Sequence, residues 1–437
     1  MPAATRSTDC DVLVVGGGPA GASTAFQLAR RGISVRVLDR ARFPRAKACA
    51  ECLSPQASRL LHDMGVLETI EPRAARMSGI TVRSPDGTVA RGDYASAHGF
   101  RAFRDHGLSV RREILDAALL DSARRAGARV DEGVRVVDLA RDAAGVVCGV
   151  HVQDDDGRVR ELSARLVIGA DGLHSMVAKR LGLTRAWPWP RRIAIVSHYR
   201  DVANVADRVE LHVERDGFVG VADVGDGVTT VAAVFPRSRA RQFAGDADAF
   251  LRRWLASKPH MAPRFERATP DGAVRVTGPF ASHARRAWSP GAFLVGDAAD
   301  FFDPFTGEGI YAGLRGGELA AEYACLAMDA VSHRGAEAAG RGYDDARHRE
   351  FGGKWRVEQL VGIGVASPLI TNRATRAMAA HKPLADLLAG VTGDFVPPRE
   401  VLRPGFLARL LLPFPGSAGS GHESQVTGHG STMAGHA

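Results

Sequence analysis

A glycine-rich turn near the start of the chain constrains the fold more than any other feature. It reads Gly16-Gly17-Gly18-Pro19-Ala20-Gly21 and lies between an apolar run at 11–15 and a helix-like pattern at 21–31. A second apolar run at 33–38 ends at Asp39, about 20 residues after Gly18. Glycines permit the tight turn and the close backbone approach that a bound pyrophosphate needs. The sequence therefore predicts a Rossmann-like α/β unit that binds a dinucleotide, with Asp39 on a ribose hydroxyl.

The pattern of the chain changes along its 437 residues. Residues 193–199, 209–213, 217–223 and 227–235 read as short alternating strands, which predicts an antiparallel sheet inserted into the first domain. We expect a cofactor domain at 1–182, with segments of the second domain near 65–107, a substrate domain at 183–280, a return to the cofactor domain at 281–330, C-terminal helices at 331–415, and a disordered tail at 416–437.

Charge and cysteine content narrow the functional classes. The net charge is +8, but only five of the 57 basic residues are lysines and the basic residues are spread along the chain. We therefore expect no nucleic-acid partner. Five cysteines, widely spaced and odd in number, and a short polar start argue against a disulfide scaffold and favour a cytoplasmic location. The chain has no apolar stretch long enough to span a membrane.

Two later motifs indicate which dinucleotide the chain binds. Val167-Ile168-Gly169-Ala170-Asp171-Gly172 resembles the Asp-Gly motif of flavoprotein hydroxylases. Leu294-Val295-Gly296-Asp297, followed by Asp303-Pro304 and Gly307-Glu308-Gly309, resembles the second flavin motif of that superfamily. The resemblance implies FAD as the cofactor, held by a domain of the glutathione-reductase type. Asp297 would accept hydrogen bonds from ribityl hydroxyls, and the N–H groups of the Gly307–Gly309 turn would face the flavin pyrimidine edge.

Two arginines extend this resemblance. Arg112 matches the arginine that the hydroxylases place against the cofactor, and Arg45 falls where the family has a base near the flavin. A solvated arginine at a helix start is the alternative for Arg112. The cofactor-binding residues that we expect are Gly16, Gly18, Ala20, Gly21, Asp39, Arg40, Arg45, Arg112, Asp171, Asp297, Pro304, Gly307, Gly309 and Ile310.

The segment at 43–55, FPRAKACAECLSP, resembles the FPRxKxCGxxLSP segment of the geranylgeranyl reductase family. The resemblance implies that Cys49 lines the flavin site, and Glu51 is a candidate general acid or base. We name both as candidate catalytic residues, with a helix-capping role as the alternative for Glu51. Cys49 and Cys52 form a C-x-x-C pair, for which a redox disulfide stays open. We expect no metal site, because no second pair of ligands is visible.

Departures from these families guide the functional prediction. Geranylgeranyl reductases carry a Y-x-W-x-F-P strand, whereas the matching stretch at 217–223 has neither Trp nor Pro. Flavin-dependent halogenases need a lysine near the flavin, yet none occurs between Lys47 and Lys179. We therefore predict an FAD-dependent oxidoreductase that hydroxylates or epoxidises an apolar small molecule, such as a specialised metabolite. The alternatives are an alkene reductase like the geranylgeranyl reductases, a halogenase, and a non-enzymatic lipid-binding escort protein.

The expected partners follow from this chemistry. NAD(P)H would bind transiently as the electron donor, because the chain has no second dinucleotide fingerprint. A separate flavin reductase is the other source of electrons. The apolar stretch at 406–414, flanked by Arg403 and Arg409, has the composition of a helix that touches a membrane surface, but we expect it to pack on the cofactor domain.

Overall fold

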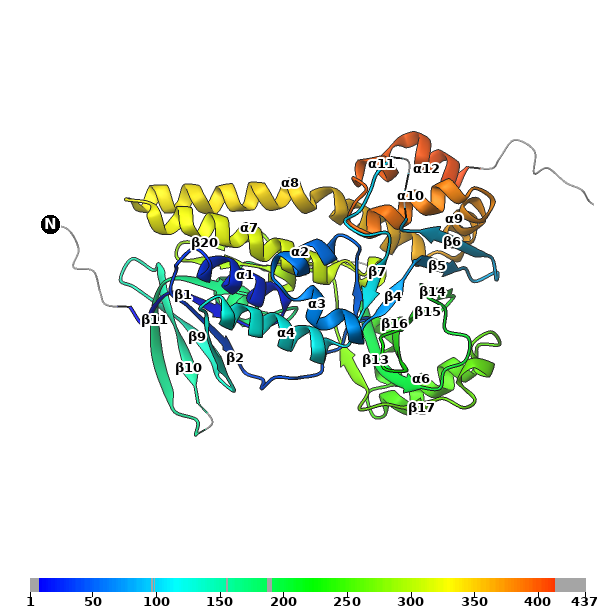
Figure 1. Cartoon of the computed structure of the whole chain (residues 1–437), viewed down its shortest axis with the longest axis horizontal. Helices are drawn as coiled ribbons and strands as arrows, with labels where there is room; N and C mark the ends of the chain where they lie inside the picture. Colours follow the sequence, from blue (N-terminus) through cyan, green and yellow to red (C-terminus); the bar gives the residue numbers. More distant parts are fainter. Residues whose placement is uncertain (1–7, 96, 98, 155, 187–190, 413–437) are drawn as a thin grey trace, which may run out of the picture.

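The computed structural model describes residues 8–95, 97, 99–154, 156–186 and 191–412. Our expectation for the tail at 416–437 lies outside these residues. The described chain forms two eight-stranded sheets. Long helices run along the first sheet, and shorter C-terminal helices cover an edge of the second (Figure 1). The predicted α/β class with an antiparallel second sheet and C-terminal helices is confirmed.

The first sheet is built around the strand that precedes the glycine-rich turn. Its strands are β1 (Cys10–Val15), β2 (Val35–Asp39), β8 (Arg129–Glu132), β9 (Arg135–Arg141), β10 (Val147–Gln153), β11 (Val159–Gly169), β20 (Trp288–Ser289) and β21 (Ala292–Leu294). Strands β21, β11, β1, β2 and β8 are parallel in that order, and β9 and β10 extend β11 as an antiparallel hairpin. Parallel strands are covered on both faces, which explains the continuous apolar run of β1.

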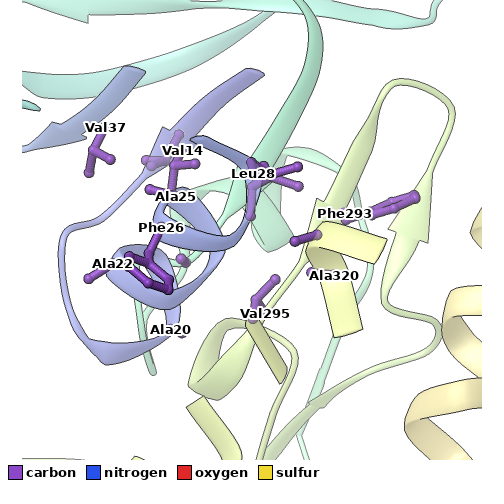
Figure 2. Packing of buried hydrophobic residues seen from close by; sticks show 14 of the residues in the cluster. Val14, Ala20, Ala22, Ala25, Phe26, Leu28, Val37, Phe293, Val295 and Ala320 are labelled. Atoms are coloured by element: carbon purple, nitrogen blue, oxygen red, sulfur yellow. The ribbon is translucent and has the colours of Figure 1, made fainter. Parts of the chain in front are cut away.

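Three helices cover this sheet around the glycine-rich turn. They are α1 (Pro19–Ala29), α4 (Arg112–Arg125) and α7 (Gly309–Asp329), and α1 contacts both of the others. Figure 2 shows Ala22, Ala25 and Phe26 of α1 in the buried cluster, with Val14 and Val37 of the sheet nearby. Small α1 residues on the face toward α7 let the two helices pack closely, so the end of β1 and the start of α7 share one site.

The second sheet contains β5 (Gly79–Arg83), β6 (Val89–Asp93), β13 (Arg192–Arg200), β14 (Val209–Glu214), β15 (Gly217–Asp223), β16 (Val228–Pro236), β17 (Thr269–Pro270) and β18 (Arg275–Thr277). Its pairs are antiparallel except for β14 with β5. Ile195 and Phe235 pack in a cluster with α6 (Ala247–Ala256), whereas their neighbours Ala194 and Val234 belong to a cluster on the opposite face. This alternation gives the sheet one structural face and one face toward the cofactor domain.

Shorter elements join the two sheets. They are β3 (Cys52–Leu53), α2 (Ala57–Asp63), α3 (Leu67–Ile70), β4 (Ala75–Met77), β7 (Gly107–Ser109), α5 (Met176–Arg180), β12 (Thr184–Ala186), β19 (Ser282–Ala284), β22 (Asp300–Phe301) and the 3-10 turns η1 (Glu71–Arg73), η2 (Arg237–Gln242), η3 (Ala262–Phe265), η4 (Gly296–Ala298) and η5 (Pro304–Thr306). Two small sheets, β3–β7–β4 and β12–β19–β22, form at the junction.

The C-terminal helices cover the outer edge of the second sheet. They are α8 (His333–Val365), α9 (Pro368–Ala380), α10 (Lys382–Thr392), α11 (Arg399–Leu402) and α12 (Pro404–Leu411). Helix α8 lies along α7 and ends at this group, and α9 and α10 contact β6 (Figure 1).

The expectation that the stretch at 406–414 packs on the cofactor domain is wrong for its described residues. Helix α12 contacts α9, and Phe406, Leu407 and Leu410 join the cluster of the C-terminal helices, because α9 offers the nearest apolar surface. Leu411 and Leu412 remain exposed. No helix among the described residues is long and apolar enough to span a membrane.

Candidate cofactor and substrate site

The glycine-rich turn has the geometry that its sequence predicts. Gly16 has a φ of +104°, which favours glycine, and a Cβ on Gly21 would lie 1.8 Å from the Gly16 carbonyl oxygen. The carboxylate of Asp39 accepts hydrogen bonds from the Gly17 N–H at 2.7 Å and from the Ala41 N–H at 2.8 Å. Asp39 therefore fixes the turn, and its contact to a ribose stays a prediction.

Two arginines stand opposite Gly18. Arg112 donates two hydrogen bonds of 2.8 Å to Asp116, and Arg45 lies 2.7 Å from the same carboxylate. A Cβ on Gly18 would meet only the Arg45 and Arg112 Nη2 atoms, at 3.7 and 3.9 Å. Burial alone would lower the pKa of Arg112, but Asp116 outweighs it and raises that pKa. Two cations with one buried carboxylate leave positive charge beside open backbone, which suits a pyrophosphate.

A cavity of about 210 Å³ extends from this turn to the second sheet. Predicted cofactor residues on its wall are Gly18, Ala20, Arg112, Asp297, Pro304, Gly307, Gly309 and Ile310. Burial raises the pKa of Asp297, against the opposing charges of Lys47 and Arg112, and burial lowers the pKa of Lys47. The cavity wall thus carries an acceptor, Asp297, together with the cations Lys47 and Arg112. A ribityl chain with its hydroxyl groups and a pyrophosphate would need both.

The loop before α7 forms the inner wall of the cavity. Asp303 accepts a hydrogen bond from the Phe305 N–H at 3.0 Å. Gly307 has a φ of +72°, and the space where a side chain would begin holds no atom within 4 Å. The first N–H groups of α7 have no partners within the helix, and its N-terminus carries partial positive charge. The loop therefore fits a group on which negative charge develops, such as the pyrimidine edge of a flavin.

A buried ion pair ties this loop to the second sheet. The Arg192 guanidinium at the start of β13 pairs with Asp303, and it also donates a hydrogen bond of 2.6 Å to the Gly362 carbonyl of α8. Both charged side chains are buried. The sheet, the loop and the long helix are thereby fixed relative to one another.

The two candidate catalytic residues lie on the cavity wall. The Cys49 Sγ accepts a hydrogen bond from the Glu51 N–H at 3.3 Å. Glu51 is 2% exposed, has a φ of +64°, and accepts a 2.9 Å hydrogen bond from the Arg112 N–H while its other oxygen lies 2.7 Å from His198 Nε2 on β13. Both Cys49 and Cys52 are free thiols. Glu51 thus joins three segments, and its catalytic role stays a prediction.

Some predicted residues do not reach the cavity wall. Asp171 accepts hydrogen bonds from Ser175 and from the first N–H groups of α5, so its carboxylate caps that helix. Arg40 is exposed, and Gly16 and Gly21 act through the backbone turn. The sequence reasoning missed other wall residues: Lys47, Phe218, Phe280, Phe301, Trp355 and Glu358. Lys47 stands within the segment at 43–55 and could have been named, whereas α8 carries no motif that points to Trp355 or Glu358.

A second cavity of about 90 Å³ adjoins the first. The two share Ala50, Cys52, Leu211, Gly220, Pro304, Thr306 and Gly307. This apolar chamber, as we call it, lies between β5, β6, β14 and β15 on one side and α9 and α10 on the other, and no charged residue is among the described residues that line it. The Thr230 hydroxyl on its wall is buried without a hydrogen-bond partner.

Comparisons with known proteins agree with this geometry. Residues 9–320 match the family described as FAD binding domain. The chain is 29% identical to digeranylgeranylglycerophospholipid reductase 2 of Methanopyrus kandleri, over 88% of this chain and 93% of that protein. It is 30% identical to the menaquinone reductase of Mycobacterium tuberculosis H37Rv, over 71% of this chain and 76% of that protein.

A solved structure shares the fold. The myxobacterial chondrochloren halogenase, an FAD-dependent halogenase, superposes with a TM-score of 0.73 and 23% sequence identity, covering 82% of this chain and 83% of that one. The two relatives are named as reductases and the solved structure is an FAD-dependent halogenase, and NAD(P)H is the typical electron donor of this family. The chain is therefore an enzyme with FAD as its cofactor, and the escort-protein alternative falls away. With its family match, its binding loop and its complementary cavity, this chain belongs to the FAD-binding-domain family of flavoprotein oxidoreductases.

Proposed function

We propose that this oxidoreductase acts on a compact, neutral and apolar molecule held in the apolar chamber. The carrying observation is that the chamber has no charged lining among the described residues and shares a wall with the cofactor cavity. Thr230 offers one unpartnered hydroxyl that would orient a polar group of the substrate. The chamber, at about 90 Å³, is smaller than the roughly 300–1,000 Å³ of common ligand pockets, which favours a compact molecule over a long polyprenyl chain.

The chain's own residues would bind and orient both molecules. FAD, when bound, supplies the electron transfer. Gly18, Arg45 and Arg112 would hold its pyrophosphate, and the turn at Gly307 would face its pyrimidine edge. The chamber residues would exclude water from the substrate, and Thr230 would donate or accept a hydrogen bond at its hydroxyl.

The reaction that we favour is oxygenation. Reduced nicotinamide nucleotide, dioxygen, the substrate and one proton would give oxidised nucleotide, water and a hydroxylated or epoxidised product. Two features support it: β15 lacks the Trp and Pro of the reductase strand, and its Gly220 and Ala222 line the chamber instead. Electrons would come directly from NAD(P)H or through a partner flavin reductase.

Alkene reduction is the second candidate, and a specific observation supports it. The curated relatives at 29–30% identity are named as reductases, and the segment at 43–55 resembles their family. Here one hydride and one proton would add across a carbon–carbon double bond. Halogenation is the third candidate: Lys47 lines the cofactor cavity, whereas no lysine is among the described residues of the chamber.

One experiment separates these reactions. The purified FAD-loaded protein, NAD(P)H and a panel of compact apolar alkenes and arenes are incubated with ¹⁸O₂, and in parallel without oxygen. Oxygenation predicts a product that carries one ¹⁸O atom and forms only with oxygen. A product heavier by two hydrogens, formed without oxygen, would replace oxygenation by alkene reduction. A protein that takes up neither FAD nor electrons from NAD(P)H would contradict both.

A further inference from the structure

We propose that Glu308 and Glu358 together carry a single proton at neutral pH, and that Glu358 presents this proton to the cofactor cavity. Glu308 lies between the two glycines of the loop before α7, and Glu358 lies on α8. Both side chains line the cavity beside Pro304 and Gly307. The inference deepens the proposed function, because it names the source of the proton that either reaction consumes.

The two carboxyl groups stand without hydrogen-bond partners. Glu308 is 5% exposed, and its Oε2 is buried with nothing to bond to. Glu358 is partly buried, and no hydrogen bond or ion pair to its carboxylate occurs among the described residues. A buried carboxylate that lacks donors loses the stabilisation that water would give its charged form.

The charges around the pair are already matched. Asp303 pairs with Arg192, Asp300 of β22 pairs with Arg347 of α8, and Lys354 of α8 pairs with Asp394, which follows α10. The positive charge of Lys354 acts on both glutamates, but its ammonium group also contacts Asp394 and the Tyr311 ring. Two carboxyl groups are thus left over in one buried region without a cation of their own.

Two unpaired acids at one site cannot both ionise at low cost. Burial raises the pKa of Glu308 and only Lys354 opposes this. Burial raises the pKa of Glu358 further, and the carboxylates of Glu308, Asp303 and Asp300 add to that effect while Lys354 opposes it. Removing one glutamate would relieve the other, so the pair behaves as one proton site.

The proton step balances for both reactions. The O–H bond of Glu358 breaks. Where the chamber and the cofactor cavity share a wall, the proton passes to the substrate atom that has gained an electron pair, or to the oxygen that leaves as water. Lys354 lies one turn before Glu358 on α8, and its positive charge would stabilise the carboxylate that remains. Solvent then returns a proton to Glu358. Reduced nicotinamide nucleotide supplies the electrons in each case.

The proton itself is measurable without any substrate. The FAD-loaded protein, labelled with ¹³C at the glutamate side-chain carboxyl carbon, is titrated by NMR from pH 4 to 9. We expect one carboxyl signal to keep its protonated shift above pH 7, and to be lost in Glu358→Gln. In Glu308→Gln the Glu358 proton affinity should fall at least tenfold. Glu337→Gln, at a partly exposed position near the start of the same helix, should leave the signal unchanged.

Turnover then tests the donor role. Glu358→Gln should lower product formation by about 10²-fold, within the range for a lost general acid, with FAD affinity unchanged within threefold. A wild-type protein whose glutamates all titrate below pH 6, or a Glu358→Gln variant that turns over normally, would overturn the proposal. If the wild type shows the protonated signal but converts no substrate, the proposed function fails and the shared proton stands.

Discussion

At the residue scale, the cofactor site depends on two glycines that have no Cβ atom. Gly21 faces the Gly16 carbonyl across a gap that no side chain fits, and Gly18 leaves open the space in front of two guanidinium groups. Both requirements concern backbone approach, so they are visible in the spacing of glycines along the sequence.

Replacing Gly21 by alanine should therefore damage the site directly. Its Cβ would lie 1.8 Å from the Gly16 carbonyl oxygen, so the turn must shift. We expect FAD affinity to fall at least tenfold, measured by quenching of flavin fluorescence on titration. Gly352→Ala on α8 is the matched control, since its Cβ meets no atom within 4 Å. Equal affinities in the two variants would contradict the role of Gly21.

Glu51 offers a second test at this scale. Its carboxylate accepts from the Arg112 N–H and contacts His198, so Glu51→Ala leaves a buried N–H without an acceptor. We expect the free energy of unfolding to fall by about 1–3 kcal/mol in urea. Glu113→Ala, partly exposed on the same helix as Arg112, should change it by less than about 0.5 kcal/mol. An unchanged free energy of unfolding in Glu51→Ala would contradict the view that Glu51 holds these segments together.

At the element scale, β13 connects the substrate sheet to the cofactor loop. Its first residue, Arg192, pairs with Asp303, and its seventh, His198, contacts Glu51. A single strand thus fixes the sheet at two points along the cofactor cavity.

Breaking the Arg192–Asp303 pair should be costly. Asp303→Leu leaves a buried guanidinium without its counter-charge, which costs about 3–5 kcal/mol of unfolding free energy. The double variant Arg192→Met with Asp303→Leu should lose less than the sum of the single changes. Urea unfolding of the four proteins in a double-mutant cycle measures the coupling, and strict additivity would show that the two side chains act independently.

The chamber gives a second prediction for the elements. Ala222 of β15 lines it and is 1% exposed, so Ala222→Phe should fill the space and lower turnover at least tenfold, with flavin reduction by NAD(P)H unchanged. Product formation and anaerobic flavin bleaching are the two measurements. Ala256→Phe, at an exposed position of α6, serves as the control. Full turnover in Ala222→Phe would place the substrate elsewhere.

The sequence was sufficient for most elements and for part of the site. The runs at 11–15 and 33–38 correspond to β1 and β2, and the helix-like pattern at 21–31 corresponds to α1, which begins and ends two residues earlier. Local periodicity and glycine spacing carry such information. Arg192 and His198 could not be foreseen as cofactor-site neighbours, because their partners lie more than 100 residues away in the chain.

At the scale of the whole molecule, acid stability depends on the second sheet. Glu210 of β14 is 7% exposed and is bound by Arg264 at 2.7 and 2.9 Å and by His212 at 2.9 Å. Burial alone would raise the pKa of Glu210, but these hydrogen bonds and charges lower it to about 2. Its folded pKa thus lies below the unfolded value, near 4.5.

The sign of the pH dependence follows. Glu210 contributes stability above about pH 4.5, and this contribution is lost as the pH falls toward 2. Glu210→Gln should therefore be clearly less stable than wild type at pH 7, with a smaller difference at pH 3. Urea unfolding at both pH values measures this. The exposed Glu266→Gln should match wild type at both. A difference that grows toward pH 3 would contradict the assignment.

The chamber also shows why whole-molecule features escape sequence reasoning. Its wall combines β5 and β6, the middle strands of the second sheet, the loop before α7, and α9 and α10. Each segment contributes small or apolar residues that any buried core would use. The uncharged chamber forms only because these segments come together in the fold, and no sequence motif predicts it.

The anchoring of α10 has a consequence for how the protein responds to salt. Its C-terminal end is followed by Asp394, whose buried carboxylate binds Lys354, whereas its first residue, Lys382, is held by ion pairs at the surface, 2.5 Å from Asp93 and from Asp386. Exposed ion pairs are weak and are screened by salt, whereas buried pairs are screened much less. Raising the salt concentration should therefore weaken the contacts at the Lys382 end of α10 before it weakens the buried pair beyond the other end.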